Sequence, residues 1–200
     1  MDLVTHIRAW RRRTLALLFM AMVAPSHAAA QSFTPGPPGP FVFDARGVVS
    51  GIPSSEAFVP PEVTTATIPT RGFGGSLGGH VYAFRLGPGR FGVGVDLTYT
   101  RGTSVDVQTT FLTIDPQISF NFGTSDGWSY LSAGVGTARV KAAPEELSES
   151  VQSFNWGGGA RWFLNPHFGI GFDIRIRMLS AGDVVPKGTS VAGAVGLSLK

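Results

Sequence analysis

Apolar and polar residues alternate with a period of two along most of the chain from Phe41 to Lys200. The alternation is clearest in residues 90–100, 111–122 and 168–178, where one face of each segment is apolar throughout. Successive side chains of a β-strand point to opposite faces, so this period is typical of half-buried antiparallel strands. No long stretch carries the apolar stripe of a helix, and the pattern therefore predicts an all-β protein.

Less regular alternation predicts five more strands, which brings the total to eight. These segments are residues 41–50, 75–86, 128–141, 154–164 and 191–199.

Tight turns and longer connections alternate between these strands. The tight turns fall at residues 86–90, 125–127 and 165–166, where Gly, Pro, Asn and Asp are concentrated. The longer connections are residues 51–74, 101–106, 142–153 and 180–190. An up-and-down sheet would place all the tight turns at one end and all the loops at the other, as in outer-membrane barrels. We therefore expect an eight-stranded antiparallel up-and-down transmembrane β-barrel over residues 41–200.

Side-chain volume indicates which face of the sheet points outward. The apolar faces carry Phe, Ile, Leu, Val, Trp and Met, whereas the opposite faces are rich in Gly, Ser, Thr and Ala. The interior of an eight-stranded barrel is only just wide enough to be filled by side chains, so the bulky groups belong outside. Lysine is also scarce, with Lys141, Lys187 and Lys200 all at loops or the terminus. The alternative is a soluble lipocalin-like carrier, which would turn the apolar faces inward around a small ligand.

The N-terminal residues have the pattern of a targeting segment. Residues 11–13 are three arginines and residues 15–23 are apolar. Ala28-Ala29-Ala30 fits the pattern of small residues at which signal peptides are cleaved. We expect residues 1–30 to be a signal peptide and residues 31–40 to be a Pro/Gly-rich leader.

Composition excludes several other classes. Hydrophobic residues make up 43% of the chain and charged residues 14%, which excludes a charge-driven disordered protein. Without residues 1–30 the basic and acidic residues balance, so nothing favours nucleic-acid binding. The absence of Cys excludes disulfides, thiolate metal sites and a Cys nucleophile.

Charged residues on the inward faces should form an ion-pair network that plugs the lumen. An enclosed charge needs a partner to offset its desolvation, and acids and bases are nearly balanced here. In the prediction, Asp96, Asp115 and Asp173 pair with Arg161, Arg175 and Arg177. Asp44 and Arg46, on the less regular first strand, are added to the network, although they could instead lie in water at a rim. The full predicted set is Asp44, Arg46, Arg85, Asp96, Asp115, Arg161, Asp173, Arg175 and Arg177.

Aromatic residues cluster near the tight turns and predict an interfacial girdle at headgroup level. Ordinary strand aromatics are the alternative, because strands are enriched in them. The residues of the predicted girdle are Phe91, Phe120, Phe122, Trp128, Tyr130, Trp162, Phe163 and Phe168.

Three glycine- and aromatic-rich stretches carry a family resemblance. They are residues 155–164 (NWGGGARWFL), residues 168–176 (FGIGFDIRI) and residues 120–136 (FNFGTSDGWSYLSAGVG). Together they resemble the bacterial outer-membrane β-barrel family, which includes the OmpA-type transmembrane domain and OmpX-like small barrels. The resemblance implies a location in the cell outer membrane, contact with outer-membrane lipid and insertion by the barrel insertion machinery. One departure is the end of the chain, Leu-Ser-Leu-Lys200, where such proteins typically end in an aromatic residue.

Candidate chemistry is sparse in this sequence. His80 and His167 have no spacing that would make a metal pair, and His167 is expected in a surface turn. Some barrels of this broad class are lipid-modifying enzymes that use Ser and His at the outer rim. His80, near the long first loop, is the candidate for such a role. We expect a monomeric, non-enzymatic barrel with a structural or interaction role and no metal or cofactor. The alternatives are a lipid-modifying enzyme and the soluble carrier.

Overall fold

The computed structural model describes residues 39–59, 68–144 and 146–200. The expected signal peptide and most of the expected leader lie outside the described residues, so cleavage after Ala30 stays a prediction.

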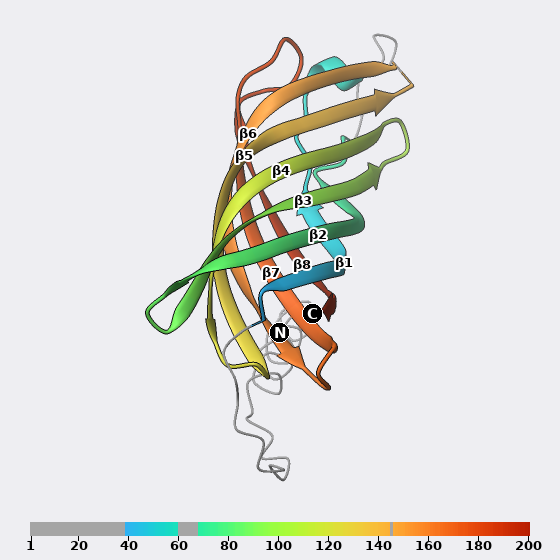
Figure 1. Cartoon of the computed structure of the whole chain (residues 1–200). Coiled ribbons are helices and arrows are strands. Elements are labelled where there is room, and N and C mark those ends of the chain that lie inside the picture. Colours follow the sequence, from blue (N-terminus) through green and yellow to red (C-terminus); the bar gives the residue numbers. More distant parts are fainter. Residues whose placement is uncertain (1–38, 60–67, 145) are drawn as a thin grey trace, which may run out of the picture. The chain divides into compact units, whose positions relative to one another are not determined.

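Eight antiparallel strands form a closed barrel in chain order (Figure 1). Each strand pairs with its neighbour in the sequence, and β1 pairs with β8 to close the barrel. The sequence-based prediction of fold class is thus confirmed. The strands are β1 (Phe41–Gly51), β2 (Arg71–Leu86), β3 (Gly89–Thr103), β4 (Gln108–Gly123), β5 (Gly127–Ala143), β6 (Leu147–Phe163), β7 (Phe168–Leu179) and β8 (Gly188–Leu199), with a short 3₁₀ helix η1 (Glu56–Phe58) after β1.

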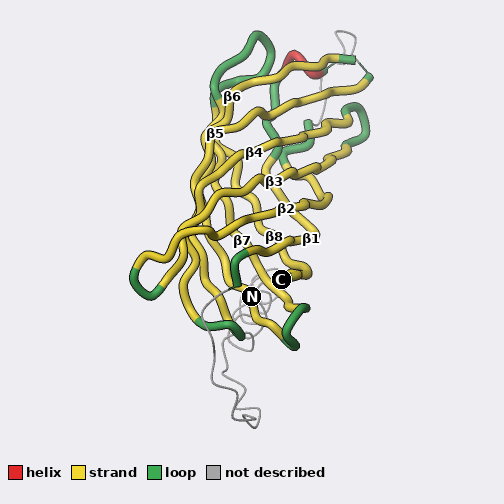
Figure 2. The backbone as a smooth tube through the Cα atoms, viewed as in Figure 1, coloured by secondary structure: helices red, strands yellow, loops and turns green. Residues whose placement is uncertain are grey.

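Several strands run further at the loop end than the alternation predicted. The β5–β6 hairpin replaces most of the long connection expected at residues 142–153, and only residues 144–146 separate its strands. Residues 104–107 form a similarly short connection, whereas residues 52–70 and 180–187 remain long (Figure 2). The four connections lie at one end of the barrel, as expected, but the predicted length was wrong for two of them. The ladder continues here without an apolar outer face, so the two-residue hydrophobic pattern fades before the strand ends.

Outward and inward faces differ sharply in polarity. Burial alternates residue by residue in β1 and β7, and the outward positions carry large apolar side chains such as Phe43, Ile170 and Ile174. The inward positions of the same strands carry Asp44 and Arg175. A soluble carrier needs the opposite arrangement, so that alternative was wrong. Among the described residues, no helix is both long enough and apolar enough to cross a bilayer.

Buried side chains lie in three layers along the barrel axis. Polar and charged residues occupy the middle. A turn-end cluster lies toward the tight turns and consists of Val42, Tyr82 and Trp128, with Phe163 packed against it. A loop-end cluster lies toward the long connections and consists of Ile52, Phe58, Val107, Phe111, Ala138, Val140, Ala142, Val151, Leu179 and Val185.

Candidate functional site: a charged network inside the barrel

Eight charged side chains project into the middle of the barrel, and each is at most 6% exposed. They come from β1, β3, β4, β6 and β7, at the positions that alternate with the lipid-facing residues. Acids and bases are equal in number, so the layer has no net formal charge. The eight are Asp44, Asp96, Asp115 and Asp173 with Arg46, Arg161, Arg175 and Arg177.

Asp44 is the centre of the first group. Its two carboxylate oxygens accept hydrogen bonds of 2.9 and 2.6 Å from Nε and Nη2 of Arg161. Arg46 lies 2.7 Å from the same carboxylate, and the Ser198 hydroxyl donates to it at 2.6 Å. Bidentate, charge-assisted contacts of this kind are among the stronger hydrogen bonds in proteins. One carboxylate thus holds two guanidinium groups.

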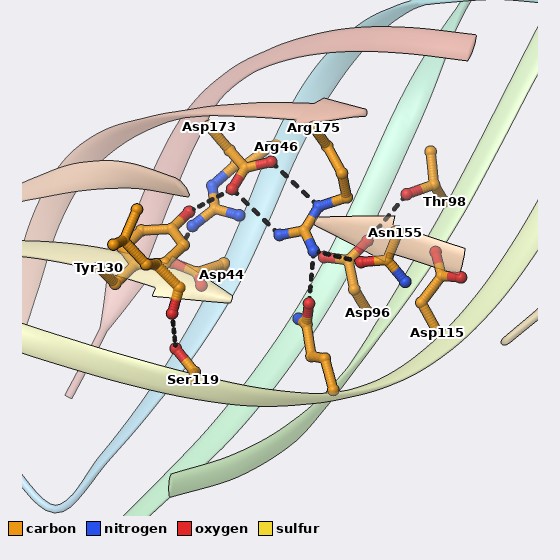
Figure 3. A network of polar contacts seen from close by, with 12 residues as sticks. Asp44, Arg46, Asp96, Thr98, Asp115, Ser119, Tyr130, Asn155, Asp173 and Arg175 are labelled. Carbon is orange, nitrogen blue, oxygen red and sulfur yellow. Dashed lines mark hydrogen bonds and ion pairs between the residues drawn. The ribbon is translucent and has the colours of Figure 1, made fainter. Parts of the chain in front are cut away.

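Tyr130 connects the first group with the second (Figure 3). The guanidinium carbon of Arg161 lies 3.9 Å from the centre of the Tyr130 ring, a cation–π contact. The Tyr130 hydroxyl donates a 2.6 Å hydrogen bond to Asp173. Arg175 completes the second group, with its Nη2 3.1 Å from Asp173.

Amide side chains extend the second group across the lumen. Nη1 of Arg175 donates to the side-chain oxygens of Gln117, on β4, and Asn155, on β6 (Figure 3). The amide nitrogen of Gln117 in turn lies 2.8 Å from Nε2 of His80. The network therefore links strands that are not neighbours in the barrel.

Asp96 and Asp115 form the third group together with Arg177. The two carboxylates stand directly opposite each other on β3 and β4, an arrangement that is destabilising for like charges. Arg177 compensates both, since its Nε lies 3.0 Å from Asp115 and its Nη2 lies 3.8 Å from Asp96. Thr98 bridges as well, accepting from Arg177 and donating to Asp96 at 2.8 Å.

One member of the predicted network, Arg85, does not belong to it. A bulge shifts the β2–β3 register between Val81 and Phe84, and β1 begins opposite Val81. Arg85 therefore lies beyond the β1 edge of the barrel and is exposed. Without Arg85, the inner network has four acidic and four basic side chains. Arg161 also pairs with Asp44 rather than with the three carboxylates predicted for it.

The predicted aromatic girdle is only partly on the outside. Phe122, Trp162 and Phe168 face outward and are well exposed, and Phe91 is partly exposed. The assignments of Trp128 and Tyr130 were wrong, because both side chains are only 1% exposed and point into the barrel. The parity of β5 shows why, since Leu131 and Val135 occupy the outward positions.

Trp128 instead belongs to the turn-end cluster. Its ring packs edge-on against Tyr82 at a centroid distance of 6.2 Å, and it packs at a tilt against Phe163 at 4.9 Å. The Nζ of Lys200 lies 5.6 Å from the centre of the Trp128 ring.

His80 lies inside the barrel and is 3% exposed, in the half nearer the tight turns. Its ring stacks on Tyr82 at 5.9 Å. Gly94 stands opposite, and a Cβ there would come within 2.3 Å of the His80 ring, so only glycine leaves this room. The expectation that His80 lies near the outer rim was wrong, because β2 begins at Arg71 and carries His80 toward the other end.

Within residues 39–59, 68–144 and 146–200, no three His, Asp, Glu or Cys side chains gather in a way that could hold a metal ion. His167 is exposed in the β6–β7 turn, as expected for a surface histidine.

A closed eight-stranded barrel with an apolar outer surface and a polar interior is a transmembrane β-barrel of the outer-membrane type. The chain belongs to the outer membrane protein beta-barrel domain family, whose model matches residues 14–198. The location in the cell outer membrane follows from this family. No protein with curated annotation matches the chain.

Solved structures with the same fold include two bacterial surface proteins. Neisserial surface protein A (NspA) is 16% identical, with a TM-score of 0.61 over 81% of this chain and 97% of that chain. Ail, the attachment invasion locus protein of Yersinia pestis, is 17% identical, with a TM-score of 0.51 over 80% of this chain and 97% of that chain. At these identities the likeness shows the fold alone.

Proposed function

We propose that this outer-membrane barrel has a structural or interaction role, that it is not an enzyme, and that its lumen is closed to ions. The observation that carries the proposal is the three-layered filling of the lumen. The loop-end cluster and the turn-end cluster are mainly apolar. The network of charged side chains, which has no net formal charge, lies between them.

An ion entering this lumen meets two different barriers. Each of the two clusters would remove most of the hydration of the ion, which is costly for any charge. In the middle layer, the charged side chains are paired with one another, as Arg161 is with Asp44 and Arg177 is with Asp115. Opening a path there means breaking buried pairs, at about 3–5 kcal/mol for each uncompensated partner.

The position of His80 supports the non-enzymatic part of the proposal. Its Nε2 contacts the amide of Gln117 and its ring contacts Tyr82, both inside the barrel, so lipid at the outer surface is out of its reach. We further propose that the barrel acts as a monomer, with outer-membrane lipid and the insertion machinery as partners. The described parts of the two long connections, residues 52–59, 68–70 and 180–187, are the surface offered to other molecules.

Solute uptake tests the closed lumen. Vesicles carrying the purified barrel should swell in a solution of small sugars no faster than vesicles without protein, while vesicles with a general porin swell quickly. Rapid swelling with the purified barrel would contradict the proposal.

Lipid analysis tests the non-enzymatic role. Cells producing the wild-type barrel and cells producing the His80→Ala variant should have the same outer-membrane lipid composition. A lipid change that depends on the wild-type barrel and disappears with His80→Ala would assign an enzyme instead.

A further inference from the structure

The hairpin between β2 and β3 projects beyond the strand that flanks it on the β1 side (Figure 2). β1 starts opposite Val81, and the backbone of Pro40 accepts one more hydrogen bond from Tyr82. Past this point β2 continues to Leu86 with β3 as its remaining partner among the described strands. The side chains of the hairpin therefore lie at the rim of the barrel.

Two arginines face each other on this hairpin. Arg85 and Arg90 are direct register partners on β2 and β3, and Arg90 is in turn opposite Asn121 on β4. Asn121 points inward and is fully buried, so all three side chains lie on the inner face of the sheet. Like charges directly opposite each other destabilise a strand pair.

Nothing in the described part of the chain compensates these two charges. Neither guanidinium has an acidic partner there, in contrast with the four arginines of the inner network. Nη1 of Arg90 makes one long contact of 3.5 Å to the backbone oxygen of Tyr82, and its Nε has no hydrogen-bond partner. The amide of Asn121 is likewise without a partner among the described residues. Most of the ten N–H donors of the two guanidinium groups are thus unused.

The opposite face of the same hairpin is strongly apolar. Phe84 is 69% exposed and Leu86 is 64% exposed. Both continue the lipid-facing surface that Val81 and Val93 form on the same strands, further from the turn. Such side chains are stable in hydrocarbon rather than in water. The hairpin is therefore held against the bilayer, with its arginines at the level where hydrocarbon gives way to headgroups.

We propose that Arg85 and Arg90 form a binding site for the phosphate of an anionic phospholipid headgroup. A guanidinium binds phosphate through paired N–H donors, and a phosphate between two guanidinium groups turns their repulsion into two attractions. Lipid is the source that the geometry favours, because the apolar face of the hairpin places the pair in the bilayer surface rather than in free solution.

Unfolding by urea in vesicles tests this site. The barrel is compared in phosphatidylcholine vesicles, in vesicles that also contain phosphatidylglycerol, and in phosphatidylcholine vesicles with added inorganic phosphate at equal ionic strength. The variants are R85Q/R90Q and the control R71Q/R139Q, which removes the same charge from exposed positions at the loop end.

We expect phosphatidylglycerol to raise the unfolding midpoint of the wild type and of R71Q/R139Q, and to raise that of R85Q/R90Q much less. The site is refuted if R85Q/R90Q keeps the whole phosphatidylglycerol effect. It is refuted as a lipid site if inorganic phosphate alone gives the whole effect.

Discussion

Arg161 of β6 and Asp44 of β1 form a bidentate ion pair across the lumen, between strands that are not neighbours in the barrel. Both side chains are fully buried, and Arg46 shares the same carboxylate. Backbone ladders connect only adjacent strands, so contacts of this kind fix opposite walls of the barrel to each other. The pair therefore has a role in shape as well as in charge balance.

Removal of Asp44 should be strongly destabilising. Asp44→Ala leaves both Arg46 and Arg161 without their shared counter-charge, and we expect the free energy of unfolding to fall by about 3–5 kcal/mol. The measurement is urea unfolding in vesicles. Asp126→Ala is the matched control, because Asp126 lies in a turn, where it accepts a hydrogen bond from Ser125. Equal effects of the two variants on the free energy of unfolding would show that the ion pairs of Asp44 do not stabilise the barrel as described.

The third group offers a test by suppression. Arg177→Met should destabilise the barrel, because it leaves Asp96 and Asp115 opposite each other without a cation. Addition of Asp96→Asn removes one of the repelling charges, so the double variant should be more stable than Arg177→Met alone in the same unfolding experiment. If Asp96→Asn makes the barrel still less stable in the Arg177→Met background, the two carboxylates do not repel each other as described.

The lipid-facing surface can be tested at Ile174. This side chain is 54% exposed on the outside of β7, next to the inward-pointing Arg175. Ile174→Arg should lower the stability of the inserted barrel by about 2–4 kcal/mol if the residue lies near the bilayer midplane. Ile174→Leu is the control and should have little effect. A harmless Ile174→Arg would contradict the assignment of the outer face.

Glu149 should control the mobility of the β7–β8 connection. Its carboxylate accepts hydrogen bonds from the backbone N–H groups of Asp183, Val184 and Val185, and Val185 is buried in the loop-end cluster. Glu149→Ala should therefore speed hydrogen exchange at residues 183–185, while Glu146→Gln on the same hairpin should not. Unchanged protection in Glu149→Ala would show that the connection is held by other contacts.

The sequence was sufficient to predict the strands that lie in the bilayer. A lipid-facing strand needs an apolar outer side and a small or polar inner side. This requirement produces the two-residue period seen in β3, β4 and β7. Beyond the bilayer an apolar outer side is no longer required, and the extensions of β5 and β6 carry no such period. Their ladder could be found only in the structure.

Parity along a regular strand also placed most of the inner charges. It could not show that Arg85 lies outside the lumen, because that depends on where β1 begins opposite β2 and not on the face that Arg85 occupies. It was not applied to Trp128, whose neighbours Leu131 and Val135 would have shown that it points inward. Individual partners such as Arg161 and Asp44 could not be predicted, since they depend on the packing of opposite walls rather than on spacing in the chain.

Planar-bilayer recording of the purified barrel is the most direct test of the closed lumen. Two apolar clusters and a neutral, bonded network should leave no continuous path for ions, so we expect a baseline without steady current steps. The barrel should be shown to be folded in the same preparation by its altered gel mobility before and after boiling. Large, steady, porin-like conductance from the folded wild-type barrel would contradict the account.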